Sequence, residues 1–418
     1  MNAPQHEVHR LKYAVEGCFN GVWGDEPNGT DDMTVVRVAD FDRKTARVAL
    51  SDNPTVRAIP PSARNRRVLA RGDLLIEKSG GGEQQPVGNV VLFDSDVHAV
   101  CSNFVARLPV VATCDARFIA YAFQSLYAQA RNIPHIKQTS GIQNLDSETY
   151  LNEPVWQPPF SKQVRIANFL DEQTARIDAL IAEKERLLEL LAEQRLSVAE
   201  RVLAPAPSGQ RGKLGFFVDL LPGYAFPADE FSRDPIDIPL LRGVNVAPSA
   251  IRWDDVVYWA REHDSALDRF KLEQGDVILG MDRPWISTGA RVAMVDESSK
   301  GALLLQRVCR LRGSDAMQQR FLYYALSSDE FRQSIEVEMT GVSVPHISPE
   351  QVLRFKVPIL SPTEQAARCH AADFAVLRIE QLEVHTTGML GRLREYRSSL
   401  ISAAVTGQLG INSYKVAA

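Results

Sequence analysis

The sequence lacks most of the short motifs that mark catalytic or metal-binding chains. It contains no GxxxxGK[S/T] phosphate loop and no HExxH zinc motif, and its eight histidines do not cluster at metal-ligand spacing. The five cysteines are scattered without a CxxC pair, which argues against a disulfide scaffold or a zinc ribbon and fits a reducing compartment. These absences favour a binding role over catalysis by this chain.

Long apolar runs and a basic surplus are also absent. No run approaches the ~18 apolar residues that a membrane helix needs, and the initial MNAPQHEVHRLKY has no apolar core of a secretory signal. We therefore expect a cytoplasmic chain. The net charge is −5, whereas a dedicated nucleic-acid binder usually carries excess positive charge. DNA binding would require basic residues clustered on one face, or a partner that supplies the phosphate contacts.

Two segments have the apolar periodicity of long helices. A length of 418 residues is too great for one ordinary domain. Apolar residues recur at steps of three and four over about 162–203 and again over about 363–408. Gly388 and Gly391 weaken the second pattern, because each costs ~1 kcal/mol relative to alanine in a helix. A helix as long as the first would reach ~60 Å, so we expect the two helices to pack against each other.

The chain repeats itself at an interval near 200 residues. The segment at 35–41 resembles that at 240–246, and each long helical segment follows a proline-containing stretch. The matching pairs, 202 or 203 residues apart, include Asp73 and Asp276, Gln163 and Gln365, Asp171 and Asp373, and Leu180 and Leu382. We infer a duplicated unit in which a globular block precedes a long helix.

The predicted fold class is α+β, with two similar globular domains separated by two long antiparallel helices in a pseudo-twofold internal duplication. One helix is expected near 117–130 and another near 318–335. The predicted boundaries are 1–157 and 205–360 for the globular domains, 158–204 and 361–410 for the central and distal long helices, and 411–418 for a tail. The predicted helix-pair seam contains Ile177, Leu180, Leu187, Leu191, Ile379, Leu382 and Leu393.

Both helical segments resemble those of one known family. The sequence PPFSKQVRIANFLDEQTARIDALIAEKERLLELLAEQRLSVAERVL at 158–203 resembles the central helical region of the specificity (S) subunit of type I restriction–modification systems. SPTEQ at 361–365 and LREYRSSLISAAVTGQLG at 393–410 resemble the distal helical region of that family. The globular blocks match in outline, through QGDVIL at 274–279 and the TSG and MTG runs.

This resemblance implies a non-catalytic DNA-recognition subunit. Each globular domain would be a target-recognition domain that reads one half of a bipartite site in double-stranded DNA. The helices, a coiled coil, would set the spacer and dock two methyltransferase (modification) subunits, with motor-nuclease (restriction) subunits joining through them. The assembled complex would be an adenine-N6 DNA methyltransferase and ATP-dependent endonuclease. Methyl donor, ATP and Mg would bind the partner subunits, and this chain would hold no cofactor or metal.

Two alternatives stay open. One is a free-standing DNA adenine methyltransferase, against which the missing cofactor loop and the Gln157 of the QPPF run both count. The other is a coiled-coil scaffold that does not bind DNA.

The candidate DNA-binding residues lie in predicted loops of both blocks. Base readout needs Arg, Lys, Asn or Gln at base edges, and phosphate contacts need Lys, Arg or backbone amides. For each residue alone, a solvated or salt-bridged surface role is the commoner outcome; as a group, the loops are better candidates than the helices. The candidates are Arg64, Arg66, Arg67, Lys78, Lys137, Gln138, Thr139, Arg283, Ser287, Thr340, Ser343 and His346.

Overall fold

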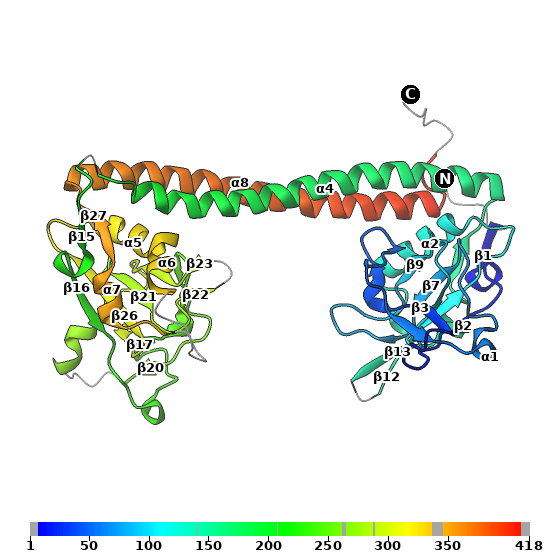
Figure 1. The fold of residues 1–418 in the computed structure, drawn as a ribbon, viewed down its shortest axis with the longest axis horizontal. Helices are drawn as coiled ribbons and strands as arrows, with labels where there is room; N and C mark the ends of the chain where they lie inside the picture. The colour runs from blue at the N-terminus through cyan, green and yellow to red at the C-terminus, as the bar shows by residue number, and fades with distance from the viewer. Residues whose placement is uncertain are drawn as a thin grey trace. The chain divides into compact units, whose positions relative to one another are not determined.

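The computed structural model describes residues 7–139, 141–206, 208–260, 265–286, 289–336 and 346–410. The chain divides into two compact units: unit 1 contains residues 1–185 and 388–418, and unit 2 contains residues 186–387. Each unit holds one globular domain and part of two long helices, α4 (Phe160–Val202) and α8 (Pro362–Val405) (Figure 1). Gly388 and Gly391 lie inside α8, and a Cβ added at either would meet no atom within 4 Å.

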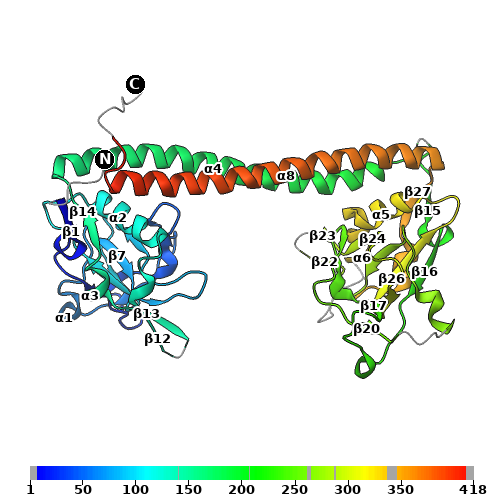
Figure 2. The ribbon, with the colours of Figure 1, turned by 180° about the vertical axis from the view of Figure 1, so that it is seen from behind.

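The domain of unit 1 is built around a six-stranded sheet with the order β2-β11-β7-β9-β5-β4. Its central strand β7 is buried along its whole length, and α2 lies between the sheet and α4 (Figures 1 and 2). The elements of this domain are β1 (Val8–Arg10), β2 (Phe19–Asn20), β3 (Asp32–Val36), β4 (Phe41–Asp42), β5 (Arg47–Val48), β6 (Val56–Ala58), α1 (Pro61–Arg64), β7 (Leu74–Glu77), β8 (Ser79–Gly80), β9 (Val90–Leu92), β10 (Ala99–Cys101), β11 (Val105–Leu108), α2 (Ala116–Ala128), β12 (Ile136–Thr139), β13 (Ile142–Leu145), α3 (Ser147–Tyr150) and β14 (Pro154–Trp156).

The domain of unit 2 has a four-stranded sheet with the order β16-β26-β21-β24, whose strand β21 is buried at every residue. Side chains of this sheet share one core with residues of α4, α5 and α8. Its elements are β15 (Arg211–Lys213), β16 (Val218–Pro222), β17 (Ile238–Leu241), β18 (Val246–Ala247), β19 (Ala250–Ile251), β20 (Tyr258–Trp259), β21 (Val277–Gly280), β22 (Trp285–Ile286), β23 (Gly289–Ala290), β24 (Val292–Met294), β25 (Leu303–Leu304), β26 (Val308–Gly313), α5 (Gln319–Ser327), α6 (Asp329–Glu336), α7 (Pro349–Arg354) and β27 (Lys356–Pro358).

The two domains have the same strand frame. β7 pairs antiparallel with β11 and β9 in unit 1, and β21 pairs in the same way with β26 and β24 in unit 2. A parallel pair, β3 with β10, has its match in β17 with β25. The β1–β14 ribbon that leads into α4 likewise matches the β15–β27 ribbon that leads into α8. The predicted α+β class and internal duplication are confirmed at the level of strand pairing, and we call residues at corresponding places in the two frames matching residues.

The helix expected near 318–335 is two helices rather than one. α5 ends at Ser327, and the next residue, Ser328, has an extended backbone with φ −77° and ψ 152°. The Ser328 hydroxyl accepts a hydrogen bond from the backbone N–H of Phe331 and donates to the carbonyl of Ala325. A serine side chain in this position caps a new helix by satisfying an N–H that lacks an intrahelical partner. The apolar pattern runs through both helices, and for this reason it concealed the break.

Within each unit the segments of α4 and α8 run antiparallel. In unit 1, Asp178 of α4 accepts from Arg397 of α8 at 2.8 Å, and Glu185 accepts from Arg394 at 2.8 Å. Residue numbers therefore rise along α4 while they fall along α8. In unit 2, Arg195 of α4 donates to Glu380 and Glu383 of α8. The Asp178–Arg397 and Glu380–Arg195 pairs consist of matching residues, so each unit has the same interhelical ion pair.

The predicted helix-pair seam needs a correction at two positions. Ile177, Leu191 and Ile379 are buried, and Leu187 and Leu393 are half-buried. Leu180 and Leu382, by contrast, are 45% and 44% exposed. The buried stripe of α4 continues from Ile177 to Ile181, a step of four residues, and this step leaves Leu180 at the solvent edge.

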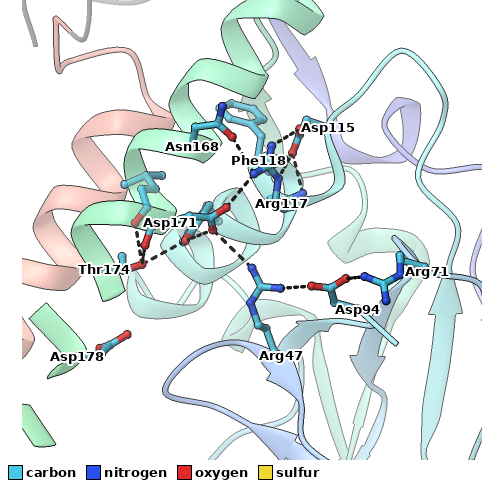
Figure 3. A network of polar contacts seen from close by, with 12 residues as sticks. Arg47, Arg71, Asp94, Asp115, Arg117, Phe118, Asn168, Asp171, Thr174 and Asp178 are labelled. Carbon is cyan, nitrogen blue, oxygen red and sulfur yellow. Dashed lines mark hydrogen bonds and ion pairs between the residues drawn. The ribbon is translucent and has the colours of Figure 1, made fainter. Parts of the chain in front are cut away.

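A polar network fastens α2 to α4 in unit 1 (Figure 3). Asp171 of α4 accepts hydrogen bonds from Arg117 at 2.9 Å and from the Tyr121 hydroxyl at 2.8 Å. Burial raises the pKa of Tyr121, so the hydroxyl remains a donor. Arg47 lies 3.6 Å from Asp171 and pairs with Asp94, which also binds Arg71. The network joins the sheet, α2 and α4 through charged hydrogen bonds.

The same joint occurs in unit 2. Asp373 of α8 accepts from Arg320 at 2.7 Å and from the Tyr324 hydroxyl at 2.6 Å. Arg320 and Tyr324 both belong to α5. Burial is the larger cause and the hydrogen bond to Asp373 the smaller cause of the raised pKa of Tyr324. At the entrance of each long helix, a buried glutamine, Gln163 or Gln365, accepts from the backbone N–H just before α2 or α5 at 2.9 Å. The domain–helix joint is therefore built twice from matching residues.

Candidate nucleic-acid interface

The basic run at 64–71 does not form a single basic surface. The Arg64 guanidinium donates to the carbonyl of Ile59 and to the carboxylate of Asp31, so it acts inside the domain. Arg67 donates to the carbonyls of Asn20 and Ala63 at 3.0 and 2.9 Å. These two arginines satisfy backbone acceptors, and their cationic groups are committed to the fold.

Arg66 and Lys78 remain candidates, and each contacts a residue of β2. Arg66 is exposed, has a left-handed backbone with φ 58°, and places its guanidinium 5.6 Å from the centre of the Phe19 ring. The Lys78 ammonium donates to Asn20 Oδ1 at 2.7 Å. Residues Phe19 and Asn20 are the two residues of β2, so the structure brings these two cations to one strand.

The hairpin of β12 and β13 carries three further candidates. In Figures 1 and 2 it lies on the side of unit 1 away from α4. The Lys137 ammonium donates to Asp146 at 2.7 Å, and this bond lowers the pKa of Asp146. The Lys137 side chain is 74% exposed, and Gln138 is also exposed. Thr139 ends β12, and its side chain lies outside the described residues.

In unit 2, two candidates lie beside an acidic residue that the sequence did not single out. Asp282 accepts from His346 Nδ1 at 2.6 Å and from Arg307 at 2.8 Å. Burial raises the pKa of Asp282, but the bonds from His346 and Arg307 outweigh it, and the pKa lies below its usual range. Arg283 is exposed with a left-handed φ of 45°. The candidates Ser287, Thr340 and Ser343 lie outside the described residues.

Asp282 and His346 occupy the places that Ser79 and Asn144 occupy in unit 1. Ser79 faces Asn144 where β8 pairs with β13, and Asp282 faces His346 in an isolated antiparallel bridge. We call these two facing positions the tip pair of each unit. The Ser79 hydroxyl donates to Asn144 Oδ1 at 2.6 Å, a separation equal to that of the His346–Asp282 bond.

Backbone hydrogen bonds on both sides fix this match. The N–H of Lys78 donates to the carbonyl of Phe104 at 2.8 Å, and the N–H of Met281 donates to that of Arg307 at 2.9 Å. The N–H of Leu145 donates to the carbonyl of Lys78. In the same way, the N–H of Ile347 donates to the carbonyl of Met281. The sequence analysis missed Ser79, Asn144, Asp282 and Arg307. The repeat offset of 202 residues, applied to His346, was the signal that could have found Asn144.

A cavity of about 500 Å³ lies in unit 1 beside α2, α4 and α8. Its charged lining is paired internally: Arg43 with Glu77, Lys44 and Arg394 with Glu185, and Arg397 with Asp178. Of these pairs, Lys44–Glu185 joins the domain to α4, and the pairs of Arg394 and Arg397 join α8 to α4.

The described residues contain no group of three or more His, Cys, Asp or Glu side chains that could hold a metal ion. All five cysteines are free, and burial raises the pKa of both Cys101 and Cys309 to about 12, which keeps them as unreactive thiols. Over the ranges given above, no helix is both long and apolar enough to cross a membrane.

No protein-family model matches the chain. The sequence is 24% identical over 361 residues to the specificity subunit of the type I restriction enzyme EcoAI from Escherichia coli, covering 83% of this chain and 59% of that protein. It is 24% identical over 264 residues to the specificity subunit of the type I restriction enzyme MjaVIII from Methanocaldococcus jannaschii, covering 59% of this chain and 61% of that protein. The chain thus spans about three fifths of the length of these curated relatives.

A solved chain from a study of complex assembly and conformational transition of the type I R-M system has the same fold. It aligns with a TM-score of 0.76 and 13% identity, covering 98% of this chain and 100% of that one. The resemblance that rested on the two helical segments is therefore confirmed by relatives whose alignment extends through most of the chain.

Proposed function

We propose that this chain, whose curated relatives are specificity subunits of type I restriction enzymes, is the DNA-recognition subunit of such a complex. Residues 1–157 and 205–360 would be its two target-recognition domains, each reading one half of a bipartite site. Residues 158–204 and 361–410 would form the helical region that sets the spacer and docks methyltransferase subunits, with 411–418 as a tail. The chain itself would carry no catalytic residue and would act in the cytoplasm.

One observation carries the proposal: the two domains share a backbone frame but present different side chains at its tip. The backbone of the two domains matches in strand pairing and in the position of the tip pair, and the domain–helix joint also matches in its side chains. A repeated scaffold of this kind would place two methyltransferase subunits in equivalent environments. Different tip side chains in the two copies would read different bases, as an asymmetric two-part site requires.

The charge balance is compatible with this role in a complex. Arg66, Lys78 and Lys137 in unit 1, and Arg283 in unit 2, are cations that could contact phosphates. They are too few to give strong sequence-independent affinity in a chain of net charge −5. The partner subunits would supply the remaining phosphate contacts.

The test is selection from a random DNA pool by the complex of this chain with its cognate methyltransferase subunit. The expected result is enrichment of two short motifs separated by a fixed gap. Enrichment of one continuous motif, or of none, would contradict the proposal. Tight binding of the methyl donor by the chain alone would favour a free-standing methyltransferase.

A further inference from the structure

We propose that the tip pair of each unit, joined in unit 2 by Arg307, determines which base its half-site carries at one position: adenine for Ser79–Asn144, and guanine for Asp282–His346 with Arg307. This inference rests on the proposed function and names residues that act within it. It follows from the chemistry that the two matching pairs display.

The frame that holds the tip pair is rigid in both units. Leu145 and Ile347, which follow the second member of each pair, are buried, at 5% and 0% exposure. The first members, Ser79 and Asp282, follow Lys78 and Met281. The backbone N–H and carbonyl of both Lys78 and Met281 are hydrogen-bonded to neighbouring segments. The pair therefore occupies a fixed position relative to the sheet, and precise base recognition depends on such support.

In unit 1 the tip pair presents a side-chain amide. Asn144 is exposed, and the hydroxyl of Ser79 donates to its Oδ1. A carbonyl oxygen has two lone pairs, so this bond orients the amide and leaves acceptor capacity on Oδ1 beside the donors on Nδ2. A paired donor and acceptor match N7 and the N6 amino group of adenine in the major groove. The nearby Lys78 ammonium can contact a phosphate.

In unit 2 an arginine lies beside the tip pair. Asp282 accepts one hydrogen bond from Arg307 Nη1, and a guanidinium has further N–H donors. The Arg307 side chain is 70% exposed, and Arg307, with a left-handed φ of 69°, immediately precedes β26. An arginine fork matches O6 and N7 of guanine, the commonest base-specific contact. Asp282 fixes both Arg307 and His346, so it positions the reader without touching the base.

The residue whose carbonyl accepts from the N–H of Lys78 or Met281 also differs between the units. Phe104 of unit 1 is 45% exposed and matches Arg307 of unit 2, while Lys78 matches the buried Met281. The cation beside the tip pair thus lies between β7 and β8 in unit 1, at Lys78, and just before β26 in unit 2, at Arg307. The surrounding backbone hydrogen bonds are the same in both units, but the left-handed φ of Arg307 has no counterpart at Phe104.

The experiment maps methylated sites by sequencing after expression of the assembled complex. Asn144→Ala should relax one adenine position in one half-site, with discrimination there falling about 5- to 150-fold. Arg307→Ala should relax one guanine position in the other half-site to a similar extent. Each variant is the matched control for the other, because its own half-site alone should change. Asn53→Ala, an exposed asparagine outside the frame, should leave both halves intact.

A further variant transfers the chemistry from one unit to the other. Ser79→Asp with Asn144→His and Phe104→Arg gives unit 1 the tip of unit 2 and should replace adenine by guanine at the affected position. If the single variants lower the yield of the complex, this exchange still tests the inference, because it replaces Ser79 and Asn144 by polar residues rather than by alanine.

Three outcomes would overturn the inference. The first is an unchanged motif in both Asn144→Ala and Arg307→Ala. The second is a uniform loss of methylation at all sequences, which a phosphate contact would give. The third is a change in both half-sites from one variant. Failure of the proposed function has a different signature, since the unaltered complex would then show no two-part motif.

Discussion

In unit 1, Asp171 of α4 accepts from Arg117 and Tyr121; in unit 2, Asp373 of α8 accepts from Arg320 and Tyr324. The joint between domain and helix is therefore repeated residue for residue. The tip pairs, Ser79–Asn144 and Asp282–His346, share a backbone but no side chain. The comparison teaches that a joint packed against a long helix tolerates few solutions, whereas a pair whose second member, Asn144 or His346, is exposed can change its chemistry.

The largest difference between the units is expected at the helix seam. Leu191 is 4% exposed in the core of unit 2, whereas the matching Leu393 of unit 1 is half-buried. Leu191→Asp should lower the free energy of unfolding by about 4 kcal/mol, because it removes apolar contacts and buries a charge. Leu393→Asp should cost about half as much. Denaturant titration measures both.

Leu190→Asp is the matched control, since Leu190 is 45% exposed and adjacent in sequence. Its cost should stay within about 0.5 kcal/mol. Equal losses from Leu191→Asp and Leu190→Asp would contradict the burial of this seam.

The two domain–helix joints should differ more modestly. Asp171 is the less exposed acceptor, with 29% of its side chain accessible against 39% for Asp373, and it also lies near Arg47. Asp171→Asn should cost about 2 kcal/mol and Asp373→Asn about 1 kcal/mol, because charged hydrogen bonds weaken with solvent exposure. Thermal unfolding of the two variants tests the order. A larger loss at Asp373 would reverse the comparison.

The smallest effect concerns acid stability. Glu153 of unit 1 accepts from Arg131 and His135, whereas its matching residue in unit 2 is Phe355. Burial raises the pKa of Glu153, but the bonds from His135 and Arg131 outweigh it and lower the pKa below 4.5. A lowered folded-state pKa stabilises above the unfolded value and loses that stabilisation as the pH falls through the folded value. The contribution at pH 7 should be about 0.5 kcal/mol.

Unfolding free energies of the unaltered chain and Glu153→Gln, measured from pH 7 down to pH 3, should therefore converge below pH 4.5. Parallel curves would show that Glu153 does not contribute through its charge. His135→Gln should remove part of the same difference.

Much of the architecture could be predicted because it depends on periodicity and repetition. The steps of three and four located α4 and α8 to within a few residues, and the offset between Asp171 and Asp373 indicated the duplication. The break at Ser328 could not be predicted from apolar spacing, since the pattern continues across it. The exposure of Leu180 and Leu382 depended on which face each helix turns to its neighbours.

The candidate site was harder to predict because its parts come from distant segments. Ser79 and Asn144 are 65 residues apart, and Asp282 and His346 are 64 apart. In the basic run at 64–71, Arg64 and Arg67 bind backbone carbonyls inside the domain. The arginine-rich sequence alone does not show whether these side chains bind the domain or DNA.

The sequence by itself determined the long helices, the twofold repetition and the α+β class, because these follow from local spacing and from likeness between two parts of one chain. Only the tertiary structure decided which polar side chains meet. Hydrogen bonds between strands, such as those around Lys78 and Met281, set the register that places a serine against an asparagine in one domain and an aspartate against a histidine in the other. A register of this kind depends on three-dimensional packing, and a shift of one residue would turn each side chain to the opposite face.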